Sequence, residues 1–428
     1  MLFQQMIHFI LLLLQIVSVL YSLKKTKYDL ALPSNILMIS LIVGYAFYAL
    51  GYELWNHNME NNTAFVYFFF FAIMVVCSLV FSNKHIKTIH EVKLPKYRNV
   101  SMLFCICIIF FLLYTMGLLI VGNRNGLGFF SAINYVKNHR GSMNPVIRQG
   151  FKVVTCSAKA SILLLVIGFN KHFYTWKYRV MLITMIVLGC VITIFSGSRG
   201  DILKILSCFF LFYFLNRGGQ GRKDFYKVIK KTMPITISVI IVFYFARLVV
   251  KNASVATGAL DFIDYINFYF GSPIEVLNIK LHNVQYYRNG YFGSSVFYDL
   301  YHDLIDVGII DNARISWSNA FVYIGNFDFG GNVATIIFPF VCDFGYLGGI
   351  IALSLIVIMG NRRYIRLKKS GSSLRILLFG YIYSIYVFAF YDSVVYQIFS
   401  LTGLFEIIVL ISIYWLLYKV NFINGSAS

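Results

Sequence analysis

The chain has 428 residues, of which 59% are hydrophobic and 13% are charged, and its mean hydropathy is +0.73. No soluble domain has this balance, so the composition excludes a soluble enzyme. Apolar runs of about 20 residues, the length that crosses a bilayer core, recur from end to end. Because lipid offers no partner to unpaired backbone groups, we expect an all-α polytopic membrane protein.

Lys and Arg outnumber Asp and Glu by 37 to 17, which gives a formal charge of +20. In a membrane protein this surplus is first a topology signal, so we expect no nucleic-acid partner. The seven cysteines all fall within apolar runs and indicate neither a disulfide framework nor a metal site. The sequence contains no HExxH, P-loop or GxGxxG motif, and we therefore expect neither a metal nor a cofactor.

The apolar runs predict about eleven transmembrane helices in a single integral membrane domain that covers 1–428. The first run has no basic region before it and no small-residue cleavage site after it, so we interpret it as a retained span. In chain order the predicted spans are 2–21, 34–52, 64–82, 100–121, 152–169, 179–196, 201–216, 232–250, 333–359, 374–391 and 395–418.

The segments between these spans alternate in charge. By the positive-inside rule the basic segments are cytoplasmic, and most acidic residues lie in the other segments. We therefore expect the N-terminus outside and the C-terminus in the cytoplasm. The basic segments are 22–33, 83–99, 170–178, 217–231 and 360–373.

Two of the predicted external segments are long, 122–151 and 251–332. A loop of about 80 residues in a compact protein is usually functional or a small domain. Within it, Asp261–Phe270 combines aromatic residues with acids three apart, which suits a helix at the membrane interface. Its many aromatic residues suit stacking on sugar rings, although an interfacial aromatic belt explains many of them equally well.

A short polar segment, Ser196-Gly197-Ser198-Arg199-Gly200-Asp201, separates two apolar runs. An arginine at the mouth of two membrane helices is costly unless an anion uses it. The glycines let the backbone approach a bound group, and Asp201 suits the N-terminus of the next helix. We interpret this segment as an anion site, and the alternative is a tight helical hairpin turn that carries a charge.

Several Lys and Arg residues lie on the predicted external side, where the positive-inside rule predicts few of them. They suit a membrane-anchored diphosphate, because guanidinium groups bind phosphate oxygens bidentately. The alternative is snorkelling to outer-leaflet headgroups, or pairing with external acids. The set comprises Arg124, Lys137, Arg140, Arg148, Lys152, Arg199, Lys204, Arg247 and Lys251. We predict that Arg140, Arg148, Arg199, Lys204 and Arg247 bind the diphosphate.

Acids and a histidine in the second loop offer a proton acceptor. Asp299, His302, Asp303 and Asp306 share one face if this segment is helical. A general base has to lie within reach of an attacking hydroxyl, although most loop acids are only solvated. His139 is a second candidate.

Three further charged residues lie within predicted spans. Asp343 needs a partner there, and an arginine from the external side is the natural one. A structural ion pair is the alternative role. Glu406 and Lys159 either pair with each other or line a cavity, and the sequence does not decide between these arrangements.

Three features together resemble the bacterial O-antigen and capsule repeat-unit polymerases of the Wzy type. They are Ser196–Gly200 between two spans, a long external loop late in the chain, and Asp343-Phe344-Gly345 followed by Gly348 in the next span. The layout is similar over essentially the full length and allows a GT-C-like architecture. Some members carry an arginine, ten residues and a glycine in each external loop. Arg314 to Gly325 has this spacing, whereas Arg140 to Gly150 is one residue short.

The resemblance implies a metal-independent glycosyltransferase at the outer face of the bacterial plasma membrane. Such an enzyme moves a growing glycan from undecaprenyl diphosphate onto a sugar hydroxyl of an incoming lipid-linked repeat unit. The implied partners are these lipid-linked donor and acceptor glycans, membrane lipids and a chain-length regulator protein. The resemblance adds Arg314 to the diphosphate-binding set. The catalytic candidates are Arg199, His302, Asp303 and Asp343.

Three other readings compete with this one. A flippase for lipid-linked oligosaccharides would line a central cavity with cations, but it does not need the long loop, and no internal repeat is visible. A ligase that moves finished polymer onto the lipid A core shares the donor lipid. A non-catalytic receptor leaves the misplaced cations unexplained.

Overall fold

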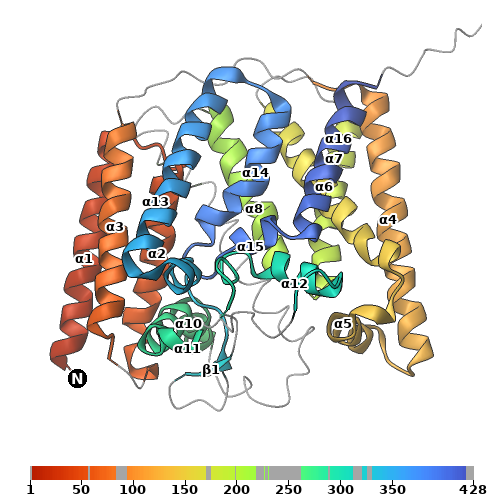
Figure 1. Cartoon of the computed structure of the whole chain (residues 1–428). Helices are drawn as coiled ribbons and strands as arrows, with labels where there is room; N and C mark the ends of the chain where they lie inside the picture. Colours follow the sequence, from red (N-terminus) through yellow and green to blue (C-terminus); the bar gives the residue numbers. More distant parts are fainter. Residues whose placement is uncertain are drawn as a thin grey trace, which may run out of the picture.

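The computed structural model describes residues 2–55, 58–82, 94–169, 175–197, 199–217, 226, 230, 262–287, 290–311, 321–324 and 330–420. These residues form a helical bundle with small elements gathered at one end (Figure 1). The predicted all-α polytopic fold is confirmed. Eight described helices are long and apolar enough to cross a membrane. They are α1 (Leu2–Lys25), α2 (Pro33–Leu50), α3 (Asn61–Phe81), α4 (Tyr97–Arg124), α6 (Pro145–Phe169), α7 (Trp176–Phe195), α13 (Ile337–Ser370) and α16 (Leu401–Tyr418).

Two further helices run beside these eight, α8 (Arg199–Arg217) and α14 (Ser373–Val387). Ten of the eleven predicted spans thus coincide with helices, and the remaining one, 232–250, lies outside the described residues. The last predicted span is divided. It begins as the short helix α15 (Val395–Ile398), and α16 then starts afresh at Leu401, where the Ser400 Oγ accepts a hydrogen bond from the Gly403 N–H at 2.9 Å.

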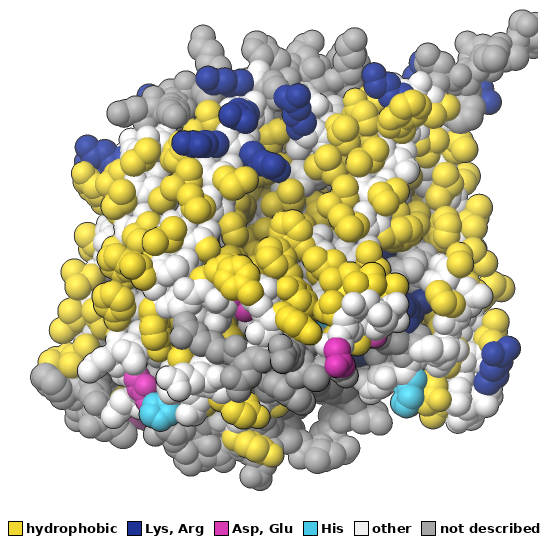
Figure 2. Space-filling view, in the orientation of Figure 1, with side chains coloured by type: hydrophobic (Ala, Val, Ile, Leu, Met, Phe, Trp, Pro, Cys, Tyr) yellow, Lys and Arg dark blue, Asp and Glu magenta, His cyan; other side chains and the backbone are white. Residues whose placement is uncertain are grey.

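The buried share of the residues differs between α6 and the helices α1 and α4. In α6, 83% of the most apolar stretch of the helix is buried inside the protein, whereas in α1 and α4 the buried share of that stretch is 28%. Large apolar side chains such as Leu13 and Ile109 remain 63% and 54% exposed. Helices that are apolar on all sides suit a surrounding of lipid, and Figure 2 shows the apolar side chains as a broad band across this face of the molecule. Other helices, chiefly α4, α7, α8 and α16, therefore enclose α6.

Lysine and arginine side chains gather at one end of the bundle, which we call the basic end (Figure 2). Lys24 and Lys25 close α1, and Lys368 and Lys369 lie in the last turn of α13. The N-terminus lies at the opposite end, and α16 finishes at the basic end (Figure 1). The helices thus alternate in direction as the charge pattern predicts, while the side of the membrane that each end faces stays a prediction.

The opposite end, which we call the loop end, carries the described parts of both predicted external segments (Figure 1). The helix expected near Asp261–Phe270 is present as α10, which begins at Phe262. The first segment is also largely helical, because α4 extends to Arg124 and α6 already begins at Pro145. The elements here are η1 (Tyr52–Leu54), α5 (Phe129–Asn138), η2 (Arg140–Ser142), α10 (Phe262–His282), α11 (Val284–Tyr287), α12 (Tyr298–Asp306) and β1 (Val322–Tyr323), which pairs antiparallel with β2 (Gly330–Gly331).

Candidate functional site

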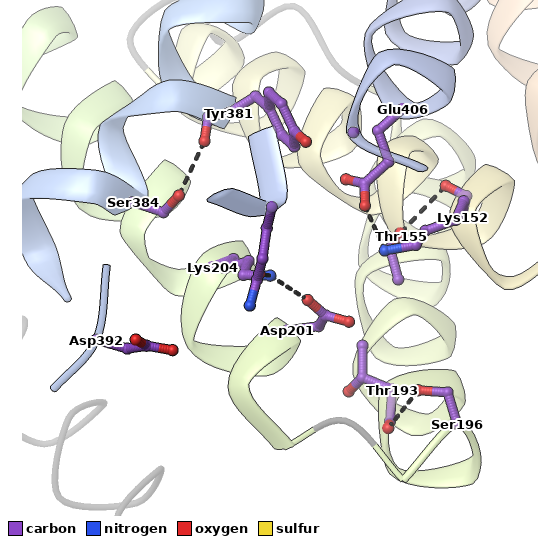
Figure 3. A network of polar contacts seen from close by, with 12 residues as sticks. Lys152, Thr155, Thr193, Ser196, Asp201, Lys204, Tyr381, Ser384, Asp392 and Glu406 are labelled. Carbon is purple, nitrogen blue, oxygen red and sulfur yellow. Dashed lines mark hydrogen bonds and ion pairs between the residues drawn. The ribbon is translucent and has the colours of Figure 1, made fainter. Parts of the chain in front are cut away.

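Five charged side chains gather inside the bundle where α6 contacts α8 and α16, and Figure 3 labels all of them except Lys159. We call them the ion cluster: Lys152, Lys159, Asp201, Lys204 and Glu406. Glu406 is bonded by two ammonium groups, with Lys152 on Oε1 and with the Lys159 Nζ 3.0 Å from Oε2. The Lys204 Nζ lies 2.7 Å from the Asp201 Oδ1. All five side chains are at most 17% exposed. Burying so many charges is expensive unless they are paired.

The spacing along α6 explains how the cations come to one place. Arg148, Lys152 and Lys159 lie four and seven residues apart, and this spacing keeps them on one face of a helix. That face meets Glu406 of α16. The ammonium groups also lie over aromatic rings, with the Lys152 Nζ 4.6 Å from the ring centre of Phe151 and the Lys159 Nζ 4.9 Å from that of Tyr381.

The ion cluster has more cations than anions. With all five groups ionised, three ammonium groups face two carboxylates, which leaves one net positive charge. Asp201 lies in the first turn of α8, and Lys204 and Glu406 lie in the second turns of α8 and α16. Helix N-termini carry partial positive charge and unpaired N–H groups. The first N–H groups of α16 are already bonded to Asp303 and Ser400, so the surplus charge and the N-terminus of α8 together favour a bound anion.

A chain of hydrogen bonds leads from the ion cluster to the connection between α14 and α15. Lys204 also donates to the Gln397 Oε1, and the Gln397 Nε2 donates to the Tyr396 hydroxyl at 3.2 Å. Tyr396 in turn donates to the Asp392 Oδ2, and the Ser393 N–H donates to the Asp392 Oδ1 at 2.7 Å. We call Lys204, Gln397, Tyr396 and Asp392 the polar chain.

Two charged groups of the loop end influence Asp392. Lys280 of α10 is fully buried, donates to the Asn332 carbonyl at 3.0 Å and attracts the Asp392 carboxylate, while Asp299 of α12 repels it. Burial raises the pKa of Asp392 to about 6, and hydrogen bonds from Tyr396 and Ser393 oppose the rise. Burial likewise lowers the pKa of Lys280 to about 8. The polar chain thus joins the ion cluster to the helices of the second external segment.

The polar segment that begins at Ser196 forms the turn between α7 and α8. The Ser196 Oγ donates to the Thr193 carbonyl at 2.9 Å, and Gly197 takes a φ of 70°, which favours glycine. Lys137 of α5 packs over Gly197, since a Cβ at that glycine would lie 2.9 Å from the Lys137 Cδ. Asp201 lies in the first turn of α8, as expected, and its partner is Lys204.

Only some of the predicted diphosphate-binding residues lie at or near the ion cluster. Lys204 belongs to the ion cluster, and Arg148 shares the α6 face of Lys152. Arg199 is the first residue of α8, and Arg140 begins η2, but the side chains of both lie outside what the structure describes. Arg247 and Arg314 lie wholly outside the described residues.

Asp343 acts as an anchor between the second external segment and α13. Its oxygens accept from the Ser295 N–H, at 3.1 Å each, and from the Val296 N–H at 2.7 Å. The Ser295 side chain also bonds Asp343, so among the described residues Ser295 and Val296, and not the expected arginine, supply its hydrogen bonds. Gly345, with φ 75° and ψ 176°, breaks α13 two residues later. The kink in α13 therefore lies beside the residue that bonds this helix to the second external segment.

The segment with the predicted proton acceptors is helical, as α12. The two catalytic candidates in it, His302 and Asp303, each contact other residues. The Asp303 Oδ2 accepts from the Leu401 N–H at 2.6 Å. It therefore satisfies a free donor at the N-terminus of α16, where a carboxylate is also favoured by the helix dipole. The His302 ring meets Tyr298 edge-on, with ring centres 4.4 Å apart. Asp303 thus has a structural task that the sequence did not reveal.

The sequence did not decide whether Glu406 and Lys159 pair. In the structure they form an ion pair, and Lys152 also bonds Glu406. The polar chain was not predicted. One available signal was Asp392 itself, a lone carboxylate between the last two apolar runs.

All seven cysteines are free thiols. Within the described ranges, no group of three His, Cys, Asp or Glu side chains is arranged to hold a metal ion. No family model, curated protein or solved structure matches the chain, so its function has to be inferred from the site.

Proposed function

We propose that this membrane protein is a glycosyltransferase that polymerises undecaprenyl-diphosphate-linked repeat units into O-antigen or capsular polysaccharide. The observation that carries the proposal is the ion cluster, with its surplus positive charge, at the N-terminus of α8 beside the Ser196–Asp201 turn. A lipid-linked diphosphate supplies the missing negative charge. The pattern of basic segments supports an orientation with the basic end in the cytoplasm and the loop end outside.

In the proposed reaction the bond between the anomeric carbon and the diphosphate breaks, and the leaving group gains negative charge. In this proposal Lys204 and the N-terminal turn of α8, which Arg199 begins, stabilise that charge. Because these groups are held by helices, they are in place before the charge develops. The helices of the loop end orient the donor and acceptor glycans.

The proposal is tested by deleting the gene and analysing the surface glycan and the lipid-linked units. We expect the long ladder to disappear while single repeat units still reach the outer face. Plasmid-borne wild-type protein restores the ladder, and the Arg199→Ala and Lys204→Met variants do not, although both reach the membrane in normal amount. Glu53→Gln, a change at an exposed carboxylate of the loop end, is the matched control and restores the ladder. Normal chain lengths in both cation variants contradict the proposal.

A flippase is the second candidate, and one observation favours it. Lys152, Lys159 and Glu406 lie within predicted spans, and ionisable groups inside a bundle often mark a transport path. The same deletion separates the two functions. Lipid-linked units trapped at the cytoplasmic face indicate a flippase, whereas finished polymer left on its carrier indicates the ligase reaction.

A further inference from the structure

Asp392 combines uncharged hydrogen-bond donors with partial exposure at the loop end. It lies in the connection between α14 and α15, outside the spanning helices, and is half-buried. Among the described residues its hydrogen bonds come from the Ser393 N–H and the Tyr396 hydroxyl, both uncharged donors. A carboxylate with uncharged donors and restricted access to water keeps its capacity to accept a proton.

The other carboxylates with described contacts at this end are engaged differently. Asp201 and Glu406 are bound to ammonium groups in the ion cluster. Asp303 accepts from the first N–H of α16, and both oxygens of Asp343 accept from backbone N–H groups. These four are committed to ion pairs or to the fold.

Glu275 of α10 also takes side-chain hydrogen bonds from uncharged groups, those of Asn278 and Tyr48, but it is fully buried, whereas Asp392 is half-buried. Among these carboxylates, Asp392 therefore combines uncharged donors with partial exposure, which suits proton transfer.

The polar chain places Asp392 in relation to the proposed leaving-group site. Only Tyr396 and Gln397 stand between its carboxylate and Lys204. A glycosyl transfer needs a proton acceptor at the attacking hydroxyl and positive charge at the departing diphosphate. The two ends of the polar chain carry these two kinds of group.

We propose that Asp392 is the catalytic residue that accepts the proton of the acceptor hydroxyl, and that Tyr396 positions it. This inference rests on the function proposed above. In the step, the O–H bond of the acceptor sugar breaks and its proton passes to an Asp392 oxygen. The acceptor oxygen forms a bond to the anomeric carbon of the donor. The bond from that carbon to the diphosphate breaks, and its electron pair leaves with undecaprenyl diphosphate.

The groups that face Asp392 define the pH dependence. Lys280 favours the charged carboxylate, Asp299 disfavours it, and the Tyr396 hydroxyl favours it through its hydrogen bond. With a pKa of about 6, the carboxylate loses its proton between acidic and neutral pH. Since a base works in its unprotonated form, the rate rises with pH through this range. Removing the Tyr396 hydroxyl raises the pKa and moves the rise to higher pH.

The test measures repeat-unit transfer by the purified full-length protein in phospholipid vesicles, with lipid-linked repeat units as substrate, from pH 5 to pH 8. We expect Asp392→Asn to lower the rate by about 10²- to 10⁴-fold, the usual range for loss of a general base. Asp392→Glu restores part of the rate. In Tyr396→Phe the acidic limb of the pH profile moves to higher pH, a change that a merely structural role does not produce. Glu53→Gln keeps the wild-type profile.

The outcomes separate this inference from the function on which it rests. A wild-type protein that transfers nothing contradicts the proposed function. If the wild type transfers while Asp392→Asn keeps its rate and its acidic limb, the inference fails and the function stands. If Asp392→Asn does not reach the membrane, Tyr396→Phe decides, and an unchanged acidic limb in that variant overturns the inference.

Discussion

Replacing Glu406 with glutamine tests whether the ion cluster is held together as the structure indicates. The change keeps the shape of the side chain but removes the charge that two buried ammonium groups share. At the 3.0 Å between the Lys159 Nζ and the Glu406 Oε2, the attraction lost is about 5 kcal/mol for an effective dielectric constant of about 20. Lys152 and Lys159 then repel each other without an intervening anion.

We expect Glu406→Gln to lower the free energy of unfolding by about 3–5 kcal/mol, the usual cost of breaking a buried pair. Lys159→Met is more stable than Glu406→Gln, because Glu406 keeps Lys152 and the remaining charges balance. The double variant is more stable than Glu406→Gln, since one unpaired ammonium group remains in place of two.

Thermal unfolding of the purified protein in detergent measures these differences, with Ser412→Ala, an exposed position on the same helix, as the control. A Glu406→Gln variant that melts with the wild type refutes the reasoning. So does a Lys159→Met variant that is less stable than Glu406→Gln, because the order of the two follows directly from the charge count.

Four further predictions concern other parts of the structure. Gly345→Ala places a side chain at φ 75°, which we expect to cost about 1–3 kcal/mol; a melting temperature equal to that of the wild type would contradict this. Asp303→Asn weakens the charged acceptor of the Leu401 N–H and should cost about 0.5–2 kcal/mol in the same melting assay. Lys280, with its pKa lowered from 10.5 to about 8, binds fewer protons in the folded than in the unfolded state between these values. Stability should therefore rise by about 3 kcal/mol from pH 8 to pH 10.5, and a Lys280→Met protein whose stability rises equally would show that the group is not responsible. Finally, inorganic pyrophosphate should raise the melting temperature of the wild type by mass action and have less effect on Lys204→Met, whereas equal shifts in both proteins would place the anion elsewhere.

The helices could be predicted from the sequence because each depends on a local window. A run of about 20 apolar residues has few alternatives to a spanning helix, and even α8, which carries Asp201 and Lys204, was recognised by its apolar remainder. The kink at Gly345 could not be predicted, because a glycine within an apolar run is compatible with a straight helix.

The pairings of the site could not be predicted because they join distant parts of the chain. Lys152 and Glu406 are 254 residues apart, and Lys204 and Gln397 are 193 apart. Asp303 shows a second limit. Its residue type suits both a proton acceptor and a helix cap, and only the position of Leu401 shows that it caps α16.

The charge balance of the ion cluster bears on whether it is a structural fastening or a binding site. A purely structural ion-pair cluster is most favourable when each buried charge has one partner, because an uncompensated charge inside the bundle lowers stability. Asp201 and Lys204 satisfy this rule, whereas Glu406 serves two lysines. Removing either lysine would leave a balanced pair, so the second ammonium group is not needed to hold α6 against α16. Its cost to the empty protein becomes a gain when an anion binds, because the same charge then acquires a partner. The anion binding that we propose would therefore account for the surplus lysine, and this imbalance makes the cluster the candidate site.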